Sequence, residues 1–173
     1  MKTIITSIFL FLFVYCYAQL KNPYKTLKYD KVVFYDFEIA DEKGLVIVNK
    51  DGSYEQSIIK QVQLDKLTIS KINNKLGDKK SFGGGQAACF DPHCGFVYYF
   101  KNKVLAQITI CLGCNGLYST IDIPAQQQGK QGKGKGVYYM LDGMSKSFRK
   151  FINELLKKYK FSHQIEKGSS FDK

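Results

Sequence analysis

Two strand-forming runs joined by a short polar turn constrain this chain more than any other feature of its sequence. Residues 96–100 and 104–110 are rich in aromatic and β-branched side chains, which favour extended structure. The residues between them, Lys101, Asn102 and Lys103, suit a tight turn. The sequence therefore predicts a β-hairpin whose open end brings together the chain segments that precede and follow it.

The length of this turn decides which side chains meet at the open end of the hairpin. A two-residue turn pairs Cys94 with Cys111 on one face. A three-residue turn pairs His93 with Cys111 instead and moves Cys94 to the other face, because a shift of one residue reverses every side chain. Both alternatives gather the same cluster, whose members are Cys89, His93, Cys94, Cys111 and Cys114.

Three kinds of chemistry are compatible with this Cys/His cluster. In a tetrahedral Zn²⁺ site, Cys111 and Cys114 supply one pair of ligands. Cys89 with either His93 or Cys94 then supplies the second pair. Two disulfides also fit, and four cysteines allow three connectivities. A redox-active C-x2-C pair is the least favoured, because the Asn-Gly after it indicates a turn rather than the helix start that lowers a thiol pKa.

The segment 89–95, the hairpin and the Cys111-Leu-Gly-Cys114 sequence resemble an uncharacterised group of small exported bacterial proteins. These proteins share a C-F-x-P-x-H-G segment, a hairpin and an I-C-x-x-C end, with helices on both sides. The resemblance covers about residues 64–161 and is specific over the hairpin. A histidine often stands in the group where this chain has Cys94, so the resemblance implies that Cys94 replaces it in any shared ligand set. The resemblance to this group implies no particular biochemical activity.

Two amphipathic helices are expected outside the hairpin. The first spans about residues 65–76, with Asp65 as its N-cap and Gly77 in position for a left-handed C-terminal cap. The second spans about 146–160 and begins after the capping residue Ser145. Its apolar side chains recur at helical spacing and form one broad stripe: Phe148, Phe151, Ile152, Leu155, Leu156 and Tyr159.

The order of the expected elements indicates an α+β domain. Strands are expected at four further places, which are residues 31–39, 45–48, 53–59 and 118–123. Strands in runs with two separated helices favour a mainly antiparallel sheet, here with the central hairpin at about 94–111 and both helices packed on it. We expect residues 19–173 to form a single domain. The Gly/Lys/Gln-rich residues 124–136 are expected to be a flexible loop.

The first eighteen residues have the pattern of a secretory signal peptide. A basic start, an apolar run and small residues before a cleavage site between Ala18 and Gln19 predict export to the periplasm or the medium. A lipoprotein signal using Cys16 is disfavoured, because the bulky Tyr15 stands where such a signal has a small residue. No other run reaches the ~20 apolar residues that a transmembrane helix needs.

The net charge of +11 suggests an anionic partner of the envelope or outside the cell. Nucleic acid is not expected, because lysine carries almost all of the positive charge and Arg149 is the only arginine. Arginine is the residue that reads guanine and clamps phosphate with two hydrogen bonds.

No catalytic residue is predicted. His163 is interpreted as a cation at the end of a helix, and Asp36 and Glu38 as solvated surface carboxylates. We therefore expect an exported, non-enzymatic binding or envelope-associated protein. The alternative is a zinc-binding protein or a metal-dependent enzyme that uses the Cys/His cluster, and a thiol-disulfide redox protein ranks third. Zn²⁺ is the only cofactor that the sequence suggests.

Overall fold

The computed structural model describes residues 22–39, 45–131, 138–165 and 170–172. The expected signal segment, with Cys16 and the cleavage residues Ala18 and Gln19, lies outside the described residues. No helix in the described part of the chain is both long and apolar enough to cross a membrane.

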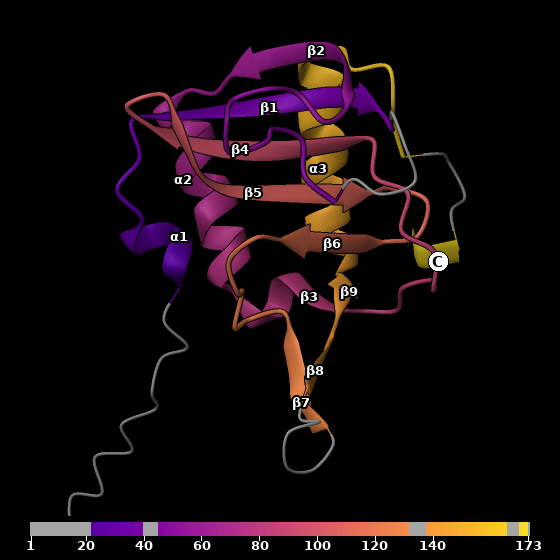
Figure 1. Cartoon of the computed structure of the whole chain (residues 1–173). Helices are drawn as coiled ribbons and strands as arrows, with labels where there is room; N and C mark the ends of the chain where they lie inside the picture. The colour runs from indigo at the N-terminus through magenta and orange to yellow at the C-terminus, as the bar shows by residue number, and fades with distance from the viewer. Residues whose placement is uncertain (1–21, 40–44, 132–137, 166–169, 173) are drawn as a thin grey trace, which may run out of the picture.

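A five-stranded antiparallel sheet forms the centre of the fold, with the strand order β2-β1-β4-β5-β6 (Figure 1). The strands are β1 (Lys31–Glu38), β2 (Ser57–Gln63), β4 (Cys94–Phe100), β5 (Lys103–Cys111) and β6 (Gly116–Ser119). Helices α2 (Lys66–Gly77) and α3 (Lys146–Lys158) lie on one face of this sheet, behind it in Figure 1. The expected α+β class, with the hairpin at the middle of the sheet, is confirmed.

Shorter elements complete the fold below the sheet and at the ends of the described chain. They are α1 (Pro23–Thr26), the 3₁₀ turns η1 (Lys79–Ser81) and η3 (Ser170–Asp172), and the ribbons β3 (Phe82–Gly84) with β9 (Gly143–Met144) and β7 (Gln127–Gln131) with β8 (Tyr138–Leu141). Of the flexible loop expected over 124–136, residues 132–136 lie outside the described residues. Residues 127–131 form a strand, because β8 supplies the backbone partners that a polar strand needs.

Both expected helices are present with the expected N-caps. Asp65 accepts a hydrogen bond from the backbone of Thr68, and Ser145 caps α3 in the same way. Gly77 has a different role from the one expected. It is the last residue of α2, and a Cβ there would lie 2.1 Å from the side-chain nitrogen of Asn22. The glycine therefore admits Asn22, whose side chain donates to the backbone oxygen of Asn73.

The core has two layers because the sheet is buried on both faces. On the helix side, Phe34 of β1 stacks on Phe96 of β4 and also contacts Phe161, which follows α3. On the other side, the segment after β1 covers the sheet with Ile47 and Val48. Burial on both faces explains why β1 and β4 read as nearly continuous apolar runs in the sequence.

The observed hairpin combines a two-residue turn with a bulge. Its turn residues, Lys101 and Asn102, have φ angles of 50° and 62°, which suit a tight hairpin turn. A one-residue bulge in β5 then shifts the register, and Cys94 pairs with Ile110. Cys94 is therefore not opposite Cys111, and the register is the one that a three-residue turn would have produced.

Gly95 is the position where the sheet tolerates a side chain least. A Cβ on Gly95 would lie 2.2 Å from the backbone oxygen of Ile108 and 2.7 Å from the side chain of Ile47. We expect Gly95→Ala to destabilise the protein by about 1–3 kcal/mol, since the backbone of β5 must shift. Gly113→Ala is the matched control, because a Cβ there meets nothing within 4 Å. Equal unfolding midpoints in urea for the two variants would contradict this prediction.

Candidate metal site

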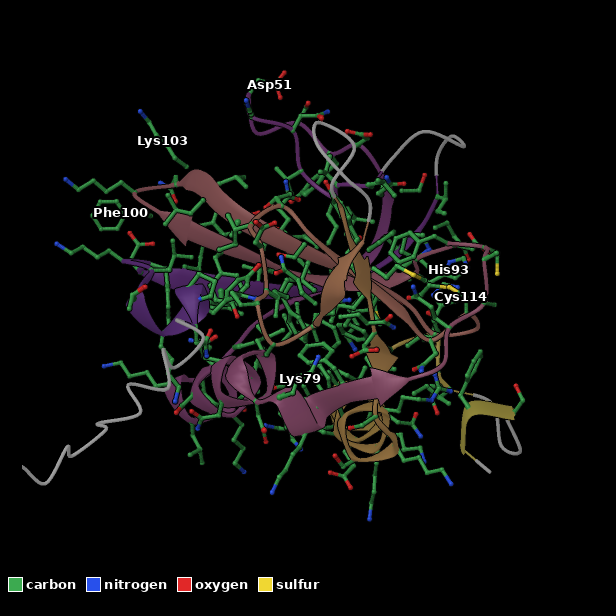
Figure 2. The ribbon with its side chains drawn as sticks, turned by 90° about the horizontal axis from the view of Figure 1, so that it is seen from below. Asp51, Lys79, His93, Phe100, Lys103 and Cys114 are labelled. Carbon is green, nitrogen blue, oxygen red and sulfur yellow. A yellow bond between two sulfur atoms is a disulfide. The ribbon has the colours of Figure 1, made fainter. Side chains whose placement is uncertain are left out.

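Three separate segments place acid and imidazole side chains together at the end of the sheet opposite the hairpin turn. Glu38 is the last residue of β1, His93 directly precedes β4, and His163 follows α3. Figure 2 shows His93 at the opposite end of the hairpin from Phe100 and Lys103, which flank the turn. One oxygen or nitrogen atom from each of Glu38, His93 and His163 can be chosen so that all three lie within 4.8 Å of one another.

Two carboxylates orient the His163 ring. Its Nδ1 lies 2.8 Å from Oδ1 of Asp36, and its Nε2 lies 3.1 Å from Oε1 of Glu38. Asp36 is completely buried, and its second oxygen accepts a hydrogen bond from the backbone of Ser162. A buried carboxylate at Nδ1 favours a proton on that nitrogen, so Nε2, which faces Glu38, is the ring nitrogen left for a metal ion.

The His93 ring is fixed by the sheet and stacks on the other imidazole. The backbone of His93 accepts from Phe37 and donates to Ile110, which continues the strand pairing to this residue. The rings of His93 and His163 are 4.2 Å apart and 15° from parallel. His93 Nε2 lies 3.3 Å from a carboxylate oxygen of Asp91, on the far side of the ring from Glu38.

The Nδ1 atom of His93 is buried and makes no hydrogen bond with the residues that the structure describes. It lies 3.3 Å from Oε2 of Glu38, which is within ion-pair distance. Buried polar atoms in folded proteins are nearly always satisfied, so an exception needs an explanation. A metal ion between Nδ1 and the carboxylate would supply the missing partner.

The donor set fits a transition-metal ion with nitrogen and oxygen ligands. With Zn–N and Zn–O bonds of about 2.0–2.1 Å, neighbouring ligand atoms of a tetrahedral site are about 3.3 Å apart. The ligand atoms of Glu38, His93 and His163 lie within 4.8 Å of one another, a wider spacing, so the stacked imidazoles must turn toward a common point to hold an ion. Two imidazoles and one carboxylate also leave the fourth tetrahedral position open.

The cysteines of the expected cluster have three different environments. Cys111 and Cys114 form a disulfide with an S–S distance of 2.09 Å. Cys89 is an exposed free thiol, and Cys94 is a fully buried one that pairs with Asp36 across β1 and β4. Burial, with a further contribution from the Asp36 charge, raises the pKa of the Cys94 thiol far above its usual value. Cys94 is therefore an unreactive core residue.

These environments predict how the free thiols react with iodoacetamide. We expect the exposed Cys89 to be alkylated in the native protein and Cys94 only after denaturation, because alkylation needs an accessible thiolate. Cys111 and Cys114 should react only after reduction. Peptide mapping by mass spectrometry measures all four sites, and rapid labelling of Cys94 in the native protein would contradict the prediction.

The only arginine of the chain connects α3 to the disulfide loop. Arg149 is 1% exposed, and its Nη1 donates to the backbone oxygen of Leu112 at 3.0 Å and to Oδ1 of Asn115 at 3.1 Å. Asn115, with a φ of 57°, donates in turn to the backbone oxygens of Gly85 and Met144. The disulfide loop thus has a fixed position beside the two histidines.

A cavity of about 360 Å³ adjoins the candidate metal site. His93 and His163 line it together with Arg149, and the disulfide loop and the segment after α3 complete its wall. The remaining lining residues are Leu112, Gly113, Gln164, Ile165 and Ser170. The histidine pair is therefore accessible to a small molecule from this side.

The sequence singled out one of the three candidate ligands and overlooked the others. His93 belongs to the expected Cys/His cluster, whereas the sequence favours a helix-end position for His163 and a solvated surface position for Glu38. The sequence contains one signal of this grouping of carboxylates with imidazoles. Strand alternation places Asp36 and Glu38 on the same face of β1, and the chain has two histidines to pair with them.

The chain matches no family model, no curated protein and no solved structure. The candidate function therefore depends on the geometry of the site itself.

Proposed function

We propose that this protein is an exported binding protein for a divalent transition-metal ion, held by Glu38, His93 and His163. The observation that carries the proposal is the buried Nδ1 of His93, which has no hydrogen-bond partner in the described part of the chain and lies beside the Glu38 carboxylate. The proposal keeps the zinc alternative suggested by the sequence but changes its ligands. The disulfide takes Cys111 and Cys114 out of the ligand set.

The surroundings of the three ligands support this proposal. Metal-binding histidines usually donate their other ring N–H to a carboxylate, which fixes the ring and strengthens the ligand. Asp36 has this position at His163, and Asp91 has it at His93. Three carboxylates around two imidazoles also favour a bound cation.

The ligand types indicate which metals the site prefers. Imidazole and carboxylate ligands suit Zn²⁺, Cu²⁺ and Ni²⁺, whereas Mg²⁺ and Ca²⁺ prefer oxygen ligands alone. We assign Zn²⁺ as the reference ion because it accepts a tetrahedral site with three protein ligands. Export is supported by the pattern of residues 1–18 and by the disulfide, since disulfides persist in oxidising compartments.

Isothermal titration calorimetry of the chelator-treated protein with Zn²⁺ tests the proposal. We expect one ion to bind per chain and Mg²⁺ to give no binding heat under the same conditions. A free Zn²⁺ concentration of 100 times Kd should also raise the free energy of unfolding by about 2.7 kcal/mol. Absence of Zn²⁺, Cu²⁺ and Ni²⁺ binding at millimolar concentrations would refute the proposed function.

A further inference from the structure

A groove lies on the face of the sheet that is turned away from α2 and α3, across the neighbouring strands β2, β1 and β4 (Figure 1). Its volume is about 440 Å³, which is within the range for small-molecule sites, about 300–1,000 Å³. Lys31, the first residue of β1, lines the groove, whereas the metal ligand Glu38 is the last residue of the same strand. The groove is therefore separate from the candidate metal site.

Three tyrosines give this groove an aromatic lining. The hydroxyl groups of Tyr35 and Tyr99 are 2.8 Å apart, and the ring of Tyr54 stands at 64° to that of Tyr35, with 6.1 Å between the ring centroids. Tyr54 is 52% exposed, and its hydroxyl donates to Oε1 of Gln61 at 3.1 Å. This hydrogen bond restrains an exposed aromatic ring, so less conformational entropy is lost when a ligand packs on it. Burial raises the pKa of Tyr35 and of Tyr99 above the usual value for tyrosine, so both hydroxyls stay protonated.

Amide side chains and one lysine accompany the aromatic rings. Within the described residues, Nε2 of Gln61, Nδ2 of Asn102 and the side-chain amide of Gln63 make no hydrogen bond. Lys31 is the one charged side chain among the described lining residues, and its Nζ lies 4.6 Å from the centroid of the Tyr99 ring. None of the described carboxylates forms an ion pair with it. The groove thus combines aromatic rings with amide donors and acceptors and a positive charge.

We propose that this groove binds an acidic saccharide, a sugar chain that carries carboxylate groups. The C–H groups on one face of a sugar ring carry partial positive charge and pack against the negative face of an aromatic ring, here that of Tyr54. Amide side chains both donate and accept hydrogen bonds, as each sugar hydroxyl does. Lys31 attracts the carboxylate. An acidic saccharide is also an anionic partner of the kind that the net charge of +11 suggests.

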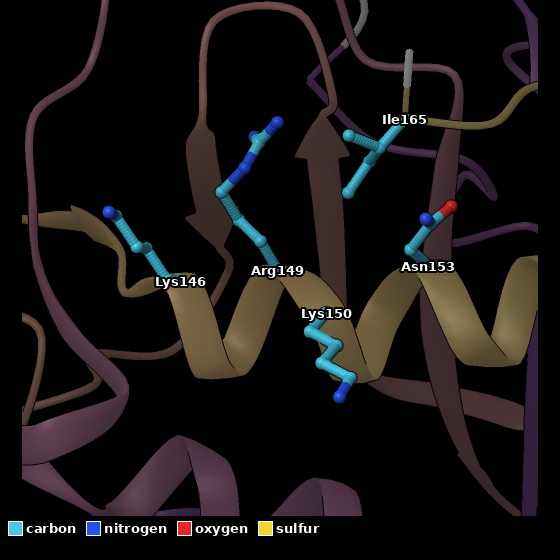
Figure 3. Close-up of a pocket in the computed structure, with 5 residues that line it drawn as sticks. All are labelled: Lys146, Arg149, Lys150, Asn153 and Ile165. Carbon is cyan, nitrogen blue, oxygen red and sulfur yellow. The ribbon is translucent and has the colours of Figure 1, made fainter. Parts of the chain in front are cut away.

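A second cavity, beside α3, has basic side chains without the aromatic ones. Its volume is about 270 Å³, and its lining residues are Lys146, Arg149, Lys150, Asn153 and Ile165 (Figure 3). No aromatic residue is among those that the structure describes there. Because a protein with a high positive charge attracts any polyanion, a lysine of this cavity shows how much of the binding depends on charge alone.

Isothermal titration calorimetry in EDTA tests the inference, because EDTA removes metal ions that bind carboxylates. The probes are short oligosaccharides of galacturonate, mannuronate or glucuronate, and the same oligosaccharides with each carboxylate reduced to an alcohol, all at constant ionic strength. We expect at least one acidic probe to bind at one site per chain, about 3-fold or more tightly than its reduced form. Absence of binding by every acidic probe at millimolar concentrations would overturn the inference, and so would equal affinities for the acidic and reduced forms.

Two pairs of variants locate the binding site. Tyr54→Ala should weaken binding of the acidic probe about 10-fold, whereas Phe100→Ala, which removes another partly exposed aromatic ring outside the groove, should leave it unchanged. Lys31→Gln should weaken binding about 3-fold and Lys150→Gln should not. Wild-type affinity in Tyr54→Ala would overturn the inference. Equal losses in the two lysine variants would also overturn it, because they would show attraction by the overall charge. Failure of Zn²⁺ to bind would refute the proposed function and leave this inference intact.

Discussion

Replacement of His163 by alanine is expected to weaken Zn²⁺ binding by at least about 100-fold. Loss of a group that only orients a metal ligand typically costs 10–100-fold in affinity, and loss of the ligand itself costs more. His163 contributes Nε2 to the site, 3.1 Å from Glu38, and is held there by the buried Asp36. His93→Ala should have an effect of the same size, because it removes the other imidazole. Calorimetric titration with Zn²⁺ measures both losses.

A pair of exposed glutamates provides the matched control for this prediction. Glu38→Gln removes a ligand charge from the site, and Glu154→Gln removes the same charge from the exposed surface of α3. We expect Glu38→Gln to lower the Zn²⁺ affinity by at least about 10-fold and Glu154→Gln to leave it unchanged. Wild-type affinity in both histidine variants would show that the metal binds elsewhere.

Replacement of Phe34 by alanine is expected to lower the free energy of unfolding by about 3–5 kcal/mol, the usual loss for a buried aromatic residue. Phe34 is completely buried where the sheet meets α3. Its ring centroid lies 4.4 Å from that of Phe96 and 4.5 Å from that of Phe161. Truncation removes both ring contacts and leaves a cavity that these rigid neighbours cannot fill.

Urea unfolding of Phe34→Ala beside Phe100→Ala gives a direct comparison. Phe100 is 39% exposed at the end of β4, so its truncation should cost less than about 1 kcal/mol. Because Phe161 lies two residues before His163, we also expect Phe34→Ala to weaken Zn²⁺ binding. A loss of stability for Phe34→Ala no larger than that for Phe100→Ala would contradict the packing described for this face of the sheet.

The sequence alone was sufficient to predict the elements that depend on interactions between residues close together in the chain. The N-caps Asp65 and Ser145 and the apolar spacing that follows each of them define α2 and α3, because capping and helical periodicity act over a few residues. The hairpin of β4 and β5 was equally predictable, since its strand residues and its turn are adjacent in the chain. These elements in this order also determined the α+β class.

Tertiary contacts decided what the sequence left open. One bulged residue in β5 set the register and placed Cys94 in the core beside Asp36, and no local pattern marks such a bulge. The candidate metal site depends on a still longer connection, because Asp36 and His163 are 127 residues apart in the sequence. They meet only because α3 packs across the sheet and brings the chain after it back to the end of β1. The sequence by itself thus determined the helices, the hairpin and the fold class, whereas the meeting of the two histidines and Glu38 required long-range packing of the whole domain.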